Sequence, residues 1–232
     1  MNDDAKALFP FRHGEWHSVS RLRQTRTAII DKAQSDKEFR HAMRVNDQKL
    51  YPWIKAWFEE LYPCSILADR LAFEDEAKYK WTPTGAADVE FQTGGRLIKV
   101  QCTVAYPHWP DSQGAQGGHL HHLEMKELNE KGYMFPGGGV SRATAQNVET
   151  DHETWRIAIA RALENKLRTR YSGCRLLIHA SGSASGLLEC DFRRDIVIPA
   201  TDRVGAAKWQ AVFKGLYVLG DAPANFAEIT PD

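Results

Sequence analysis

The first part of the chain carries apolar residues at helical spacing. Residues 19–34 contain few turn formers and predict a helix, and Ser35 followed by Glu38 is a capping-box pattern that predicts a second helix beginning there. In residues 50–61 the apolar side chains recur every three or four positions, which predicts a helix with one buried stripe. We expect Pro63 to end this helix.

Alternating apolar and polar residues predict two strands within residues 87–106. Between them Gly94 and Gly95 predict a two-residue turn, because glycine adopts the positive φ angles of such turns without steric cost. Counting outward from the turn pairs Thr93 with Arg96, Phe91 with Ile98, Glu90 with Lys99, Val89 with Val100, and Asp88 with Gln101. Apolar residues then meet apolar partners and polar residues meet polar ones, as a consistent register requires.

Further segments complete the expected order of elements. We expect a strand in residues 65–76, helices at about 119–131 and 153–171, a buried strand over 174–180, a strand near 195–199, a helix near 202–213 and a last strand at 216–220.

The composition is that of an ordinary globular protein, with 43% hydrophobic and 26% charged residues in 232. Thirty Lys and Arg balance thirty Asp and Glu, so a nucleic acid would have to be bound by a local basic patch. The apolar runs are short and the chain begins with Met1 and an acidic stretch, so we expect a cytoplasmic protein without a signal peptide or membrane span. We interpret the four separated cysteines as reduced thiols, the alternatives being a disulfide framework or a zinc site.

The hairpin supplies the first candidate site. Side chains directly opposite each other on antiparallel strands have Cβ atoms about 4.5–5.5 Å apart, so the Asp88 carboxylate and the Gln101 amide oxygen can converge on one hard cation. Glu90 and Lys99 would lie beside them. The alternative is a solvated polar face with an ordinary cross-strand pair between Glu90 and Lys99.

The order of elements resembles the PD-(D/E)XK nuclease superfamily, which has the restriction-endonuclease-like fold. The resemblance covers residues 50–106 and 153–180. It implies an α/β protein with a mixed central sheet flanked by helices. A helical extension would occupy residues 1–49, and a nuclease-like domain would occupy residues 50–232 with an insertion at about 107–152.

The family's motif places an Asp at the start of the second core strand, and an acidic residue, any residue and Lys on the third. Asp88 matches the first position, Gln101 stands in the acidic position, and Thr103 stands in the lysine position. Glu60, which flanks the buried stripe of its helix while Glu59 points away, matches the family's frequent helix carboxylate. The resemblance implies that Asp88, Gln101 and Glu60 hold Mg²⁺ or Mn²⁺ for hydrolysis of a DNA phosphodiester.

The departures from that motif leave two functions open. Gln101 brings no negative charge, and Thr103 cannot act as the ammonium that stabilises charge at the phosphate. Lys99 is on the same face as Gln101 and can supply a migrated ammonium, and Glu90 can supply the missing charge. Without them the protein would be a catalytically inactive nuclease-fold binding module of a mobile-element or defence system.

Basic residues further along provide candidate contacts to nucleic acid. Arg142, Lys166 and Arg170 would meet phosphates, although a solvated helix surface is the other interpretation. We also expect a possible homodimer and no membrane partner.

A histidine cluster gives a third hypothesis. His119 and His122 can share one helix face, while His121 cannot point to the same ion as its neighbour His122. The corresponding function would be that of a zinc hydrolase.

Overall fold

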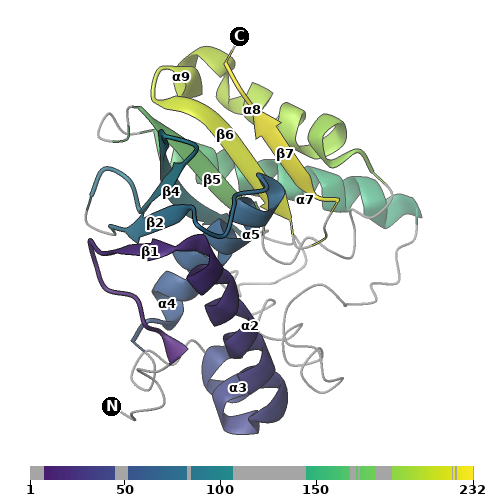
Figure 1. Cartoon of the computed structure of the whole chain (residues 1–232). Helices are drawn as coiled ribbons and strands as arrows, with labels where there is room; N and C mark the ends of the chain where they lie inside the picture. Colours follow the sequence, from purple (N-terminus) through teal and green to yellow (C-terminus); the bar gives the residue numbers. More distant parts are fainter. Residues whose placement is uncertain are drawn as a thin grey trace. The chain divides into compact units, whose positions relative to one another are not determined.

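The computed structural model describes residues 8–44, 52–82, 85–106, 145–167, 171, 173–180, 190–220, 222 and 224–231. The chain divides into two compact units, Met1–Cys102 and Thr103–Asp232. Both units combine helices with β-strands (Figure 1), so the expected α/β class is confirmed.

The first unit contains a helical N-terminal part and an antiparallel sheet. Its strands pair in the order β1-β2-β3-β4, each antiparallel to the next. The elements are β1 (Trp16–Ser18), α2 (Val19–Ser35), α3 (Lys37–Arg44), α4 (Ile54–Ala56), the π-helix η1 (Trp57–Leu61), α5 (Tyr62–Arg70), β2 (Lys78–Trp81), β3 (Val89–Thr93) and β4 (Arg96–Ala105), whose last three residues belong to the second unit.

The β3–β4 hairpin has the predicted register. Thr93 lies opposite Arg96, and the pairs continue without a shift to Val89 and Val100. Gly94 and Gly95 form the turn with φ angles of 52° and 74°, which lie in the left-handed region that favours glycine. The apolar side chains at 89, 91 and 100 are fully buried, so one face of the hairpin packs into the core.

The predicted helix over 19–34 is α2, but the cap of the next helix differs from the prediction. Asp36 caps α3, because its Oδ1 accepts hydrogen bonds from the backbone N–H groups of Glu38 (3.0 Å) and Phe39 (2.9 Å). The hydroxyl of Ser35 instead donates to the carbonyl of Asp31 at 2.8 Å. The capping-box assignment to Ser35 is therefore wrong by one residue.

Pro63 does not end the helix, and the strand predicted over 65–76 is wrong. Elements α4, η1 and α5 run without interruption from residue 54 to residue 70. The N–H of Tyr62 bonds to the carbonyl of Trp57, five residues earlier, so the helix is widened just before the proline. This widening accommodates a residue that lacks an N–H and would clash in a regular helix interior. Cys64 and Leu67 are then buried from a helix, not from a strand.

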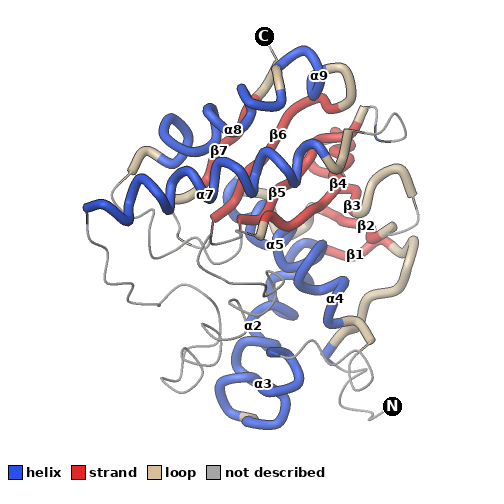
Figure 2. Tube along the Cα trace, turned by 180° about the vertical axis from the view of Figure 1, so that it is seen from behind, coloured by secondary structure: helices blue, strands red, loops and turns tan. Residues whose placement is uncertain are grey.

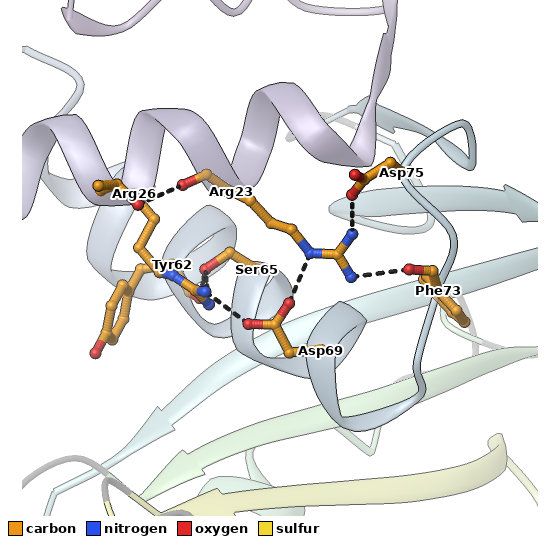
Figure 3. Close-up of polar contacts among 8 residues, drawn as sticks. Arg23, Arg26, Tyr62, Ser65, Asp69, Phe73 and Asp75 are labelled. Atoms are coloured by element: carbon orange, nitrogen blue, oxygen red, sulfur yellow. Dashed lines mark hydrogen bonds and ion pairs between the residues drawn. The ribbon is translucent and has the colours of Figure 1, made fainter.

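Two arginines fasten α2 to α5 and to the chain that follows it (Figure 3). Arg23 donates from Nε to Asp69 Oδ1 at 2.7 Å, from Nη1 to Asp75 at 2.5 Å and from Nη2 to the carbonyl of Phe73 at 2.8 Å. Arg26 donates to the other oxygen of Asp69 at 2.6 Å. Both carboxylate oxygens of Asp69 are thus bound, which fixes the crossing of the two helices.

The sequence prediction missed β1 and β2. Strand β2 has the alternation of a half-buried strand, since Tyr79 and Trp81 are buried while Lys78 is exposed and Lys80 is half-buried. Both strands are only three or four residues long, so few positions carry the pattern.

The second unit contains the β5–β7 part of a mixed sheet, with helices packed on it. Strand β5 pairs parallel with β6, and β6 pairs antiparallel with β7. Figure 2 shows α7 and α8 along one face of this sheet, and the core lies between these helices and the sheet. The elements are α7 (Ala145–Glu164), β5 (Cys174–Ala180), the π-helix η3 (Phe192–Val197), α8 (Ile198–Val204), α9 (Ala206–Gln210), β6 (Phe213–Gly220) and β7 (Phe226–Ile229).

Predictions for the second unit are confirmed in part. The buried strand over 174–180 is β5, and the last apolar segment at 216–220 lies in β6. The helix expected over 153–171 begins earlier, at Ala145, and ends at Glu164. Strand β7 was not predicted.

The strand expected near 195–199 is wrong, because this segment is helical. Asp191 caps it by accepting a hydrogen bond from the N–H of Arg194 at 3.0 Å, and Ile196 and Val197 are buried from the helix. The helix expected near 202–213 is divided by Gly205, whose φ of 90° ends α8 and starts α9. Short apolar runs do not distinguish buried strands from buried helices.

The expected helix at 119–131 lies outside the described residues, as does most of the expected insertion. Within the part of the chain that the structure describes, no helix combines the length and apolar character needed to cross a membrane.

Candidate functional site

Asp88 and Gln101 meet in the first unit as their opposition across the hairpin predicts. Oδ2 of Asp88 accepts a hydrogen bond from Nε2 of Gln101 at 2.5 Å and another from the backbone N–H of Cys102 at 2.8 Å. Asp88 is 7% exposed and Gln101 is 3% exposed. A carboxylate and an amide are therefore held together in a buried position beside β4.

The remaining polar atom of Gln101 is not satisfied. Its Oε1 is buried and has no hydrogen-bond partner. Leaving a buried carbonyl oxygen unpaired costs about 1–3 kcal/mol of folding free energy. Oε1 of Gln101 is therefore a candidate ligand for a bound cation or molecule. Amide and carboxylate oxygens are ligands that Mg²⁺ and Mn²⁺ accept.

These two residues fit part of a divalent-cation site. Together they offer oxygen ligands and one negative charge, and Mg²⁺ commonly combines one or two carboxylates with water and phosphate oxygens. Among the described residues, no group of three or more His, Cys, Asp or Glu is arranged to hold a metal. Within the described part of the chain, Asp88 and Gln101 therefore supply only part of a ligand set.

The side chain of Glu60 has a structural role. Its Oε2 accepts a hydrogen bond from the indole Nε1 of Trp81 at 2.5 Å, which ties η1 to β2. Its backbone carbonyl lies 3.9 Å from Sγ of Cys102, the residue whose N–H bonds to Asp88. Cys102 thus contacts both Glu60, on η1, and Asp88, just before β3. A role for Glu60 as a metal ligand stays a prediction.

Glu90 lies between two lysines on neighbouring strands. Its carboxylate is 2.7 Å from Lys80 Nζ and 3.8 Å from Lys99 Nζ, in the order given by the strand register. The Lys99 side chain is 46% exposed and that of Lys80 only 23%, so Lys99 is the more available cation. Alternation along the strands places these side chains on the same sheet face as Asp88 and Gln101.

Lys80 is a neighbour of the candidate site that sequence reasoning missed. Its ammonium also lies 4.8 Å from the ring centroid of Trp16, a side chain that is 40% exposed. The alternation in residues 78–81 was the signal that could have placed Lys80 on this face.

Two of the other predicted site residues are described, both in the second unit. Thr103 is half-buried on the part of β4 that belongs to the second unit. Lys166, also in the second unit, has its Nζ 5.4 Å from the ring centroid of Tyr171. Five predicted residues lie outside the described part of the chain: Arg142, Arg170, His119, His121 and His122.

Comparison with known proteins gives no significant match to a family model, a curated protein or a solved structure.

Proposed function

We propose that the protein is a metal-dependent nuclease that hydrolyses phosphodiester bonds in DNA, with Asp88 and Gln101 binding Mg²⁺ or Mn²⁺. The observation that carries this proposal is the unpaired, buried Oε1 of Gln101 beside the Asp88 carboxylate. A cation bound there would coordinate the unpaired oxygen of Gln101 and neutralise the charge of Asp88. The resemblance to PD-(D/E)XK nucleases supports the same pair of residues.

Each residue has a distinct part in this mechanism. When bound, the cation would supply Lewis acidity and a water of lowered pKa at the phosphate. Asp88, held by the Cys102 N–H, supplies the fixed negative charge. The exposed ammonium of Lys99 is available to a phosphate oxygen, and the carboxylate of Glu90 keeps it near the site.

A specific observation supports the second candidate, an inactive binding module. The amide of Gln101 already donates a hydrogen bond to Asp88, so the two side chains are held together without a cation. Thr103 offers no ammonium in the position that the family gives to lysine. This alternative predicts binding of DNA or a protein partner without any divalent ion.

The test compares wild type with Asp88→Asn and Asp31→Asn. Asp88→Asn keeps a hydrogen-bond acceptor and removes the charge, and Asp31→Asn makes the same change on the exposed side of α2. Supercoiled plasmid and single-stranded DNA are incubated with each protein in Mg²⁺, Mn²⁺ or EDTA. We expect metal-dependent cleavage by wild type and Asp31→Asn only. Equal cleavage by Asp88→Asn would overturn the proposal, and DNA binding in EDTA without any cleavage would favour the binding module.

A further inference from the structure

Two cysteines from distant parts of the first unit are in contact in its core. Sγ of Cys64, on α5, lies 3.5 Å from Sγ of Cys102, on β4. Both are free thiols and both are buried. Neither thiol is used in the proposed hydrolysis, so the contact calls for an explanation of its own.

We propose that Cys64 and Cys102 form a reversible disulfide, which links α5 to β4 and acts on Asp88 through the backbone of Cys102. The inference goes beyond the proposed function and does not depend on it.

The geometry needs only a small movement. A disulfide has an S–S length of about 2.05 Å, so the sulfurs must approach by about 1.5 Å from their present contact. The bond would close a loop between positions 38 residues apart. Closing such a loop restricts the unfolded chain, so the oxidised protein should be the more stable form unless the native geometry is strained.

The chemistry balances with a peroxide as oxidant. One thiol reduces hydrogen peroxide, giving a sulfenic acid and one water. The second sulfur then attacks the sulfenic sulfur, forming the S–S bond and releasing a second water. Two thiols lose two electrons and two protons in total, and the peroxide accepts them.

The surroundings select a small, uncharged oxidant. Cys64 has no solvent exposure and Cys102 is 4% exposed, so a molecule the size of water is best suited to reach them.

Oxidation acts on the candidate site through one residue. Cys102 donates its backbone N–H to Asp88 at 2.8 Å and precedes the unit boundary on β4. Pulling its sulfur toward α5 changes the position of this N–H, and with it the carboxylate of Asp88. Hydrogen exchange at the Cys102 amide reports this change without metal or DNA.

The experiment maps disulfides in the wild-type protein after graded treatment with hydrogen peroxide. Free thiols are alkylated in denaturant, the protein is digested without reduction, and disulfide-linked peptides are identified by mass spectrometry before and after treatment with dithiothreitol. Cys174 and Cys190 act as internal references, because Cys174 is buried and Cys190 is half-buried. We expect a peptide pair joined through 64 and 102, reversed by dithiothreitol.

Variants separate the specific bond from general oxidation. Cys102→Ser should abolish the linked peptide pair, and Cys190→Ser should leave it unchanged. In the oxidised wild type the Cys102 amide should exchange at a different rate from the reduced form. Persistence of both thiols at peroxide levels that oxidise Cys190 would overturn the proposal, as would a disulfide that leaves exchange at Cys102 unaltered. Neither the disulfide mapping nor the exchange measurement depends on DNA cleavage. A wild-type protein without nuclease activity would therefore overturn the proposed function and not the disulfide.

Discussion

The backbone N–H of Cys102 donates to the Asp88 carboxylate at 2.8 Å, which holds an acidic side chain against strand β4. Asp88 stands just before β3, and its own N–H bonds to the carbonyl of Val100 at 2.9 Å. The residue is thus fixed by backbone and side chain together. A carboxylate held in this way is preorganised, because it does not need to reorient to meet a cation.

Replacing Asp88 separates its structural part from its charge. Asp88→Ala removes the acceptor and leaves the N–H of Cys102 and the amide of Gln101 without it, so we expect a loss of about 1–3 kcal/mol in the free energy of unfolding. Asp88→Asn can keep one acceptor and should lose less. Urea denaturation of the two variants and wild type measures the difference, and an equal loss in both would show that the carboxylate charge itself stabilises the fold.

Gln101→Glu tests whether the pair can hold a cation. The change places a second carboxylate against Asp88 in a buried position, where two like charges repel each other. We expect a lower melting temperature than wild type in EDTA and recovery in millimolar Mn²⁺, because a cation bound to the folded state stabilises it. Gln92→Glu makes the same change at an exposed position of β3 and serves as control. Destabilisation of Gln101→Glu that Mn²⁺ does not relieve would contradict a cation site.

The hairpin was predictable because several independent signals agree on it. Gly94 and Gly95 define the turn, and alternation on both sides leaves only one register that buries the apolar residues. The opposition of Asp88 and Gln101 follows from that register. Their shared hydrogen bond could not be predicted, because it depends on side-chain orientation.

The helix around Pro63 shows why other elements were missed. A proline normally signals the end of a helix, but here the π-helical turn before it widens the backbone and the helix continues to Arg70. No local pattern encodes this widening. Likewise, the pairing of Lys80 with Glu90 depends on β2, a strand too short for its alternation to stand out.

Glu60 offers a test of its described bond to Trp81. Glu60→Gln retains an oxygen acceptor for the indole N–H, whereas Glu60→Ala removes it. We expect Glu60→Ala to lose about 1–2 kcal/mol of unfolding free energy and Glu60→Gln to lose less, because a buried donor left unpaired carries a desolvation cost. Chemical denaturation measures both. If Glu60 also ligates a cation, Glu60→Gln should weaken Mn²⁺ binding in a titration, and unchanged binding would contradict the prediction that Glu60 is a metal ligand.

The β3–β4 turn predicts a contrast between two substitutions. Gly95→Val places a branched side chain at a φ of 74°, and we expect a loss of about 1–2 kcal/mol from backbone strain. Gly94→Asn should be tolerated, because asparagine followed by glycine is favoured in turns of this kind. Apart from the adjoining residues, nothing lies within 4 Å of the position that a Cβ would take at either glycine, so contacts of the Cβ itself do not explain the contrast. Equal stability of the two variants, measured by thermal unfolding, would refute this account.

Asp69 gives a pH dependence whose sign can be stated. Burial alone would raise the pKa of its carboxyl, but the hydrogen bonds and charges of Arg23 and Arg26 outweigh burial and hold the pKa below its usual value. The folded state therefore favours the carboxylate, and this stabilisation is present above the unfolded pKa of about 3.9 and is lost as pH falls through the folded pKa. We expect Asp69→Asn to cost about 1–2 kcal/mol at pH 7, since the ion pairs are partly exposed.

The same comparison in acid completes the test. The difference in unfolding free energy between wild type and Asp69→Asn should shrink between about pH 5 and pH 2, because wild type loses its carboxylate there while the variant has none to lose. Asp75→Asn is the matched control, since that carboxylate contacts Arg23 but its side chain is 66% exposed, and its effect should be smaller at every pH. A difference for Asp69→Asn that stays constant from pH 7 to pH 2 would show that the arginines bind Asp69 without favouring its ionised form.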